Sequence, residues 1–161
     1  MNNSNQLFIE LHVPDFDVAV DFYKKLGFEV VSYDATIDGL GYFLMQRGNT
    51  ILNFYGGSEK VYDQSFFKQF PKNTPRGFEV EITIPIDDVK KCFEEIKNNI
   101  PAAIVQEIKE KHDRKSDNFE LVWHDFRVVD PFGFYLRFTE PINWKKCFCG
   151  SDKDYTVCHG K

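Results

Sequence analysis

The stretch Val13–Phe28, which reads VPDFDVAVDFYKKLGF, decides the fold. The residues before it, 7–13, alternate in part between apolar and polar side chains and stop at a proline, which is typical of a β-strand. Within the stretch, Asp15 or Asp17 is a suitable N-cap for a helix whose apolar side chains share one face, and Gly27 is a suitable helix end. The sequence therefore begins with a predicted strand followed by an amphipathic helix.

The chain repeats this pattern after a connector. The extended segments predicted after the first helix are 28–33, 41–46 and 50–55. A polar connector with two prolines covers 56–76, with one helical turn expected at 65–70. The elements predicted after it are a strand over 77–86, a helix that begins after Asp87 or Asp88, and extended segments at 103–109, 119–129 and 134–139, with turns at 112–118 and 130–133.

The two halves are an internal duplication. Asp15 and Asp88 are 73 residues apart, and both precede a helix. The same shift superposes the core-facing positions of the two helices, namely Phe16 on Val89, Ala19 on Cys92 and Tyr23 on Ile96. We therefore predict an α+β fold of two tandem βαβββ modules, about residues 6–56 and 77–141, whose strands form a cupped mixed β-sheet around a shared concave space.

Two motifs carry a resemblance to a known family. The stretch Val13–Phe28 resembles the opening of the vicinal oxygen chelate superfamily, which includes glyoxalase I, extradiol dioxygenases and the bleomycin- and fosfomycin-resistance proteins. The string Asp130-Pro131-x-Gly133-x-x-x-Arg137-Phe138 resembles the closing strand of that superfamily. The resemblance implies one domain over residues 1–141 that holds its ligand in the cup.

Metal-dependent members of the superfamily place His or Glu at four strand positions that face the cup. The resemblance assigns these positions to Phe8, to Leu52 or Asn53, to Glu81 and to Arg137. Of these, only Glu81 is a good ligand for a divalent metal, and Arg137 would repel one. We therefore expect no metal in the cup, although a relocated site built from Glu10, His12, Glu81 and Glu79 stays open.

The orientation of Arg137 follows from strand alternation. We expect its side chain to face the cup together with Tyr135 and Thr139, while Leu136 and Phe138 face the helices. A charge in such a place needs a partner, and Glu81 or Glu10 is the nearest candidate by strand order.

The cup combines aromatic side chains with a few polar groups, as small-molecule pockets do. The predicted ligand-binding residues are Phe8, Glu10, Asn53, Glu81, Thr83, Trp123, Tyr135 and Arg137. This composition resembles the bleomycin-resistance branch, which implies a homodimer that binds a small molecule without a catalytic metal. A binding protein is thus favoured over an enzyme. The alternatives are a metal-dependent lyase, isomerase or dioxygenase of the same superfamily, and a scaffold whose cup is filled by its own Phe side chains.

The C-terminal residues 142–161 form a separate tail. Residues 147–159 read CFCGSDKDYTVCH, so Cys147, Cys149, Cys158 and His159 offer three thiolates and one imidazole, a tetrahedral set for structural Zn²⁺. The tail resembles the SEC-C motif, and the alternative is a tail of free thiols. It is too short to bury a core, so zinc would supply its folding energy. Its charge of +2 suits an acidic protein or ribosomal RNA as partner.

Composition limits the remaining functions. The 161 residues carry a net charge of −5, which disfavours a nonspecific nucleic-acid binder. No apolar run approaches the ~20 residues that cross a bilayer. The polar N-terminus does not read as a secretory signal, so we expect a cytoplasmic protein with no membrane partner.

Overall fold

The computed structural model describes residues 9–116 and 119–144. The described chain divides into two compact units. The first unit runs to Val80 and also includes Asp130–Phe134, and the second comprises Glu81–Val129 and continues from Tyr135. A short segment that lies late in the sequence thus belongs to the first unit.

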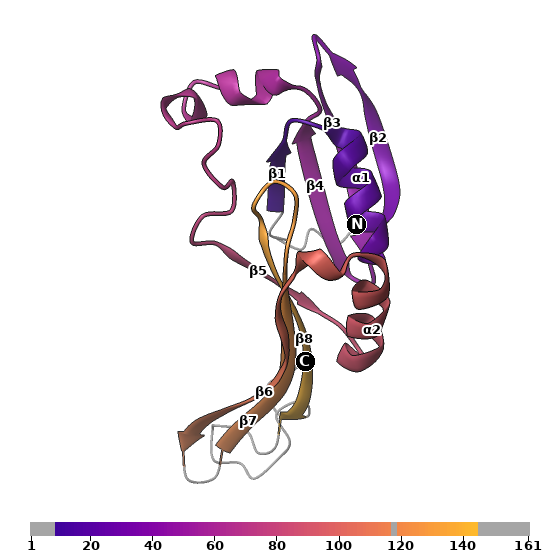
Figure 1. Ribbon diagram of the computed structural model, residues 1–161, viewed down its shortest axis with the longest axis vertical. Coiled ribbons are helices and arrows are strands. Elements are labelled where there is room, and N and C mark those ends of the chain that lie inside the picture. Colours follow the sequence, from indigo (N-terminus) through magenta and orange to yellow (C-terminus); the bar gives the residue numbers. More distant parts are fainter. Residues whose placement is uncertain (1–8, 117–118, 145–161) are drawn as a thin grey trace, which may run out of the picture. The chain divides into compact units, whose positions relative to one another are not determined.

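The first unit is a four-stranded sheet with one helix (Figure 1). Its elements are β1 (Ile9–Val13), α1 (Phe16–Lys25), β2 (Glu29–Ile37), β3 (Leu40–Arg47), β4 (Thr50–Gly56) and the 3-10 helices η1 (Glu59–Asp63) and η2 (Phe67–Gln69). The strand order is β1-β4-β3-β2, with β1 parallel to β4 and the other pairs antiparallel.

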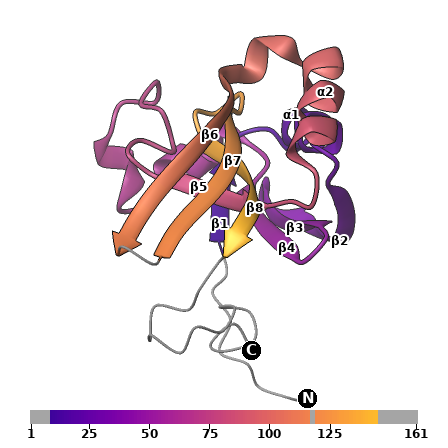
Figure 2. The same cartoon turned by 90° about the horizontal axis from the view of Figure 1, so that it is seen from below.

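The second unit repeats this arrangement. Its elements are β5 (Glu81–Pro85), α2 (Val89–Asn99), the 3-10 helix η3 (Pro101–Ala103), β6 (Ile104–Ser116), β7 (Phe119–Val129) and β8 (Tyr135–Trp144). The order is β5-β8-β7-β6, again with only the first pair parallel, and Figure 2 shows β6, β7 and β8 side by side. The predicted duplication and the α+β class are confirmed.

Each helix is fixed by its cap and by its apolar face. The Asp15 carboxylate accepts a hydrogen bond from the backbone N–H of Val18 at 3.0 Å, and Asp88 does the same for Lys91 at 2.9 Å. These contacts settle which of the two candidate caps serves each helix. The superposed core positions are all buried: Phe16, Ala19, Tyr23, Val89, Cys92 and Ile96.

Each core is a stack of aromatic rings between a helix and its sheet. In the first unit, Tyr23 of α1 packs on Phe54, which stacks on Phe43 with 4.5 Å between ring centroids. In the second unit, Phe93 of α2 packs on Phe126, and Phe126 stacks on the Phe138 ring at 5.1 Å. Much of the high Phe content is therefore core filling.

Several predicted boundaries are wrong. The strand expected over 77–86 begins only at Glu81, because Phe78 and Val80 donate backbone hydrogen bonds within a turn and Glu79 has φ 59°. The turn expected at 112–118 is wrong in its first part, because β6 continues to Ser116. The last strand, which the sequence predicts to end at 139, reaches Trp144.

Both helices are short. Within residues 9–116 and 119–144, no helix combines the length and the apolar character that crossing a membrane requires.

Candidate functional site

In both sheets, the face opposite the helix carries polar side chains. On the first sheet, Glu10 of β1 lies beside Asn53 of β4 in the strand register, and the Glu10 carboxylate accepts a hydrogen bond from the Asn53 amide at 2.8 Å. Its other oxygen lies 2.8 Å from His12 Nε2. Leu52 is fully buried on the helix side, so the ambiguous register of this strand is decided in favour of Asn53.

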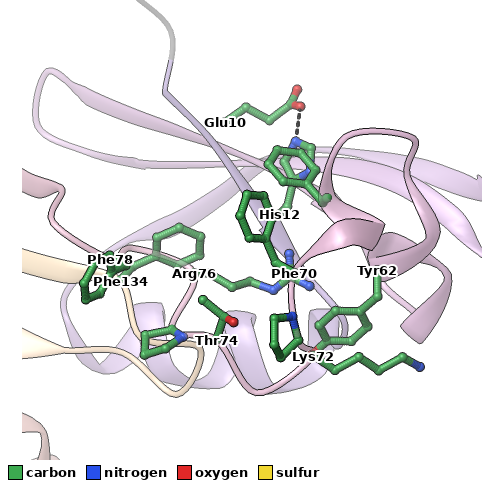
Figure 3. A pocket seen from close by; sticks show the side chains of 12 residues that line it. Glu10, His12, Tyr62, Phe70, Lys72, Thr74, Arg76, Phe78 and Phe134 are labelled. Carbon is green, nitrogen blue, oxygen red and sulfur yellow. Dashed lines mark hydrogen bonds and ion pairs between the residues drawn. The ribbon is translucent and has the colours of Figure 1, made fainter.

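The connector that follows β4 in the sequence builds a cavity next to this polar face. The cavity has a volume of about 390 Å³, and we call it the connector cavity (Figure 3). Its apolar walls are Phe67, Phe70, Pro71, Pro75, Phe78 and Phe134, and its polar walls are Glu10, His12, Tyr62, Lys72, Thr74 and Arg76. Every one of these residues belongs to the first unit. Of the predicted ligand-binding residues that the structure describes, only Glu10 lines it.

The histidine of this face is held by its neighbours. The His12 ring contacts the Tyr55 ring with 5.1 Å between centroids and the Phe67 ring at 5.2 Å. Its Nδ1 atom is buried and has no hydrogen-bond partner among the described residues. His12 is therefore a fixed, partly buried wall of the connector cavity, with Nε2 engaged by Glu10.

Arg76 is positioned by the backbone of the turn at 130–134. The N–H of Arg76 donates to the Phe132 carbonyl at 3.1 Å, and the N–H of Gly77 donates to the Gly133 carbonyl at 3.3 Å. Gly133 has φ +92°, and a Cβ built on it would lie 2.9 Å from the Cβ of Pro75. The connector and the turn thus approach too closely for a larger residue at 133.

Asp130 holds that turn in shape. One of its carboxylate oxygens accepts hydrogen bonds from the N–H groups of Phe132 and Phe134 at 2.9 and 2.8 Å. The other accepts from the Tyr23 hydroxyl of α1 at 3.1 Å. Burial among these neutral donors raises the pKa of Asp130 to about 6, and burial next to Asp130 also raises the pKa of Tyr23. The Asp-Pro-x-Gly motif is therefore an anchor for the first unit.

The second sheet carries a network of ion pairs on the face opposite its helix. Glu81 of β5 accepts from Arg127 of β7 at 2.9 Å and from Arg137 of β8 at 3.4 Å. Both arginines also bind Asp125, Arg127 through Nη1 at 2.8 Å and Arg137 through Nη2 at 2.8 Å. The two carboxylates and the two guanidinium groups therefore alternate and neutralise one another.

Asp125 is the centre of this network and is fully buried. Its other partners are Trp123 Nε1 at 2.8 Å, Gln106 Nε2 at 3.1 Å and the more distant ammonium group of Lys111 at 3.8 Å. Burial raises the pKa of Asp125, but the Trp123 hydrogen bond and the charges of Arg137 and Arg127 outweigh it, so the pKa lies below its ordinary value. The pKa of Arg127 is raised, since its partners outweigh its own burial.

Arg137 lies on the predicted face of its strand, opposite the helix. Its side chain is half-buried and pairs with Glu81, whereas Leu136 and Phe138 are fully buried on the helix side. The other proposed partner, Glu10, instead binds His12 and Asn53.

The remaining predicted residues fall on two separate units. Thr83 alternates with buried isoleucines on β5 and lies beside Arg137 in the register, and Tyr135 lies beside Glu81. The Arg137 guanidinium lies over the Trp123 ring at 5.4 Å. Glu10 and Asn53 belong to the first unit and the other described candidates to the second. Phe8, Cys147, Cys149, Cys158 and His159 lie outside the described residues.

Sequence reasoning missed Asp125, Arg127 and Arg76. The first two could have been found, because polar and apolar residues alternate from Asp125 to Val128 and place both aspartate and arginine on one face of the strand. Arg76 lies in a connector without periodicity, so no local pattern marks it.

Potential metal ligands do not cluster in the part of the chain that the structure describes. No group of three or more His, Cys, Asp or Glu side chains there is arranged to hold a metal ion. Glu79, a candidate for a relocated site, lies in the turn before β5 and not on a strand.

Comparison with known proteins places the fold but not the family. No family model matches the sequence, and no curated protein matches it. Among solved structures, a hypothetical protein from S. aureus is similar with a TM-score of 0.58 and 22% identity, over 85% of this chain and 94% of that one. A bleomycin-binding protein complexed with bleomycin has a TM-score of 0.52 and 21% identity, over 86% of this chain and 100% of that one.

A third solved structure is a glyoxalase family protein from Enterococcus faecalis. Its TM-score is 0.53 at 16% identity, over 87% of this chain and 100% of that one. These similarities cover nearly all of each solved chain. The protein therefore has the fold that bleomycin-binding and glyoxalase-family proteins share.

Proposed function

We propose that the protein binds a small organic molecule in the connector cavity and belongs to the non-enzymatic, bleomycin-resistance-like branch of the vicinal oxygen chelate superfamily. The observation that carries the proposal is the cavity itself, about 390 Å³ with mostly aromatic and proline walls and a few fixed polar groups. Ligand pockets of soluble proteins have this size and composition. The bleomycin-bound structure of the same fold supports a binding role, although it does not identify the ligand here.

The aromatic walls provide a direct test with a neutral probe, indole-3-acetamide. Phe67 and Phe70 line the cavity and are 41% and 49% exposed, so alanine at both positions should leave the fold intact. Aromatic contacts contribute about 0.5–1.5 kcal/mol each, so the double change Phe67→Ala with Phe70→Ala should raise Kd roughly tenfold. Titration of amide signals by NMR measures this Kd.

Phe66 supplies the matched control. It touches both rings but does not line the cavity, so Phe66→Ala should change Kd less than about twofold. An equal loss in this control would contradict the proposal, as would the absence of saturable binding by indole probes.

We propose that the ion-pair face of the second sheet holds no catalytic metal. Both oxygens of Glu81 are engaged by guanidinium groups, and Arg137 supplies a positive charge where metal-dependent members have a ligand. A metal there would have to displace two cations from Glu81. The metal-dependent enzyme that the sequence left as an alternative has no supporting observation in the described residues.

The zinc tail and the homodimer stay predictions from the sequence. We propose that Cys147, Cys149, Cys158 and His159 hold one structural zinc that favours contact with an acidic protein or ribosomal RNA. Elemental analysis should find one zinc per chain, lost in Cys147→Ser without a change in the unfolding of the rest of the chain. A second tightly bound metal per chain would contradict both this proposal and the metal-free face.

A further inference from the structure

The charges around the connector cavity are not balanced. Among the residues that the structure describes, two cations, Lys72 and Arg76, and one carboxylate, Glu10, line it. Glu10 is already engaged on both oxygens, by His12 at 2.8 Å and by Asn53 at 2.8 Å. Its capacity to attract a cationic ligand is therefore reduced, and the excess charge in the cavity is positive.

Arg76 carries this excess. Lys72 forms an ion pair at 3.2 Å with Glu59, a residue that does not line the cavity. Arg76, in contrast, has no carboxylate within ion-pair distance among residues 9–116 and 119–144, and its guanidinium lies 4.3 Å from the centroid of the Tyr62 ring. Figure 3 shows its side chain reaching toward the middle of the cavity.

The arginine is also held in place before any ligand arrives. Its backbone is hydrogen-bonded to the turn that Asp130 organises, and the Tyr62 ring supports the planar guanidinium group. A guanidinium that is fixed in this way keeps its hydrogen-bond donors directed, which is how arginine recognises carboxylates. Binding a ligand should therefore cost Arg76 less conformational entropy than it would cost a freely moving side chain.

We infer that the ligand of the connector cavity is an aromatic molecule with an acidic group, whose carboxylate pairs with Arg76 while its ring contacts the phenylalanine walls. This inference rests on the proposed function. It identifies Arg76 as the residue that selects anionic over neutral ligands at that site, and the aromatic walls as the source of affinity common to both.

Three indoles that differ in one group provide the test. Indole-3-acetate is anionic, indole-3-acetamide is neutral and tryptamine is cationic at pH 7. Hydrogen bonds to charged groups are strong enough that the acetate should bind roughly tenfold more tightly than the acetamide. Tryptamine should bind most weakly. The dissociation constants are measured by NMR titration of the full chain at one fixed salt concentration.

The variant Arg76→Gln should bring the acetate and the acetamide to within about twofold of each other while the acetamide still binds. Arg76→Lys should restore part of the preference, since the charge returns without the planar fork. The matched control is Lys68→Gln, which removes one positive charge from η2 at a residue outside the cavity wall. The control should keep the tenfold preference, roughly as in the unaltered protein.

The outcomes separate this inference from the proposed function. Equal binding of acetate and acetamide overturns the inference and leaves the cavity as an aromatic binding site. Loss of the preference in Lys68→Gln overturns it as well, because the effect would then be general electrostatics. If none of the three indoles binds, the proposed function itself is overturned.

Discussion

The polar faces of the two sheets differ in how their charged groups are satisfied. On the first sheet, Glu10 uses neighbours on β1 and β4, and the adjoining connector leaves Arg76 without a carboxylate among the described residues. On the second sheet, Asp125 and Glu81 neutralise both arginines of the same face. The two sheets thus share one strand order, yet the first adjoins an open cavity and the second carries a closed set of ion pairs.

The two buried aspartates show the same contrast. Asp130 of the first unit accepts hydrogen bonds from neutral donors alone within the described part of the chain, and its pKa is raised to about 6. Asp125 of the second unit lies between two arginines, and its pKa is lowered. Burial alone does not decide the pKa of a carboxyl group, because the charge of its partners can reverse the shift.

The largest expected effect is in the second unit. Asp125→Asn removes the anion that both arginines share, so it should lower the free energy of unfolding by about 3–5 kcal/mol. Urea denaturation measures this loss. A loss below about 1 kcal/mol would show that the ion pairs are no more than an exposed network, and the contrast between the faces would then be lost.

The next effect depends on pH. Because the pKa of Asp130 is raised, the folded protein binds a proton more tightly than the unfolded chain does. The contribution of Asp130 to the free energy of unfolding should fall by up to about 3 kcal/mol as the pH rises from about 4 to about 6. Asp130→Asn should remove this slope, which is measured as the difference between the two unfolding profiles across that range.

Asp125 provides the internal comparison. Since the pKa of Asp125 is lowered, its contribution to the free energy of unfolding stays constant between pH 4 and pH 6 and is lost only at lower pH. Asp125→Asn should therefore destabilise the protein without changing the slope in that window. Parallel pH profiles for the unaltered protein and Asp130→Asn would contradict the assignment of the slope to Asp130.

A smaller effect is expected at the turn that holds Arg76. Gly133→Ala places a Cβ against Pro75 at a positive φ, so it should cost about 1–3 kcal/mol and weaken the binding of indole-3-acetate. Gly48 has φ +56° with nothing within 4 Å of a built Cβ, so Gly48→Ala reports the backbone strain alone. Equal effects on binding in the two variants would show that the turn does not position Arg76.

The smallest effect is expected on the first sheet. The Glu10 side chain is 39% exposed, and its partners are one imidazole and one amide. Glu10→Gln should therefore change the free energy of unfolding by less than about 1 kcal/mol, measured in urea under the conditions used for Asp125→Asn. A loss as large as that of Asp125→Asn would remove the distinction between the two faces.

The sequence was most informative where structure depends on neighbours along the chain. Asp15 and Asp88 were recognised as candidate caps because an N-cap requires only a short polar side chain before an amphipathic run. The face of Arg137 followed from strand alternation, and its partner Glu81 followed from the strand order that the duplication implied. Periodicity and repetition are local signals that tertiary structure did not override.

The errors lie where long-range contacts decide. Residues 77–80 look like a strand, yet Gly77 is hydrogen-bonded to Gly133 far along the chain, and a turn forms instead. Arg137 does pair with Glu81, but its shorter contact is with Asp125, at 2.8 Å against 3.4 Å, and the sequence did not indicate Asp125 as a partner. The connector cavity was missed because its walls come from residues without periodicity whose positions depend on the same distant turn.

The inclusion of Asp130–Phe134 in the first unit has a consequence for synthesis on the ribosome. A nascent chain that has emerged only as far as Val80 contains β1 to β4 and α1 but lacks the carboxylate that accepts the Tyr23 hydrogen bond. A buried hydroxyl without a partner costs about 1–3 kcal/mol, so this first half is held below its final stability until residue 134 has left the exit tunnel. The N-terminal module is thus translated first but completed late, after most of its duplicate has been made.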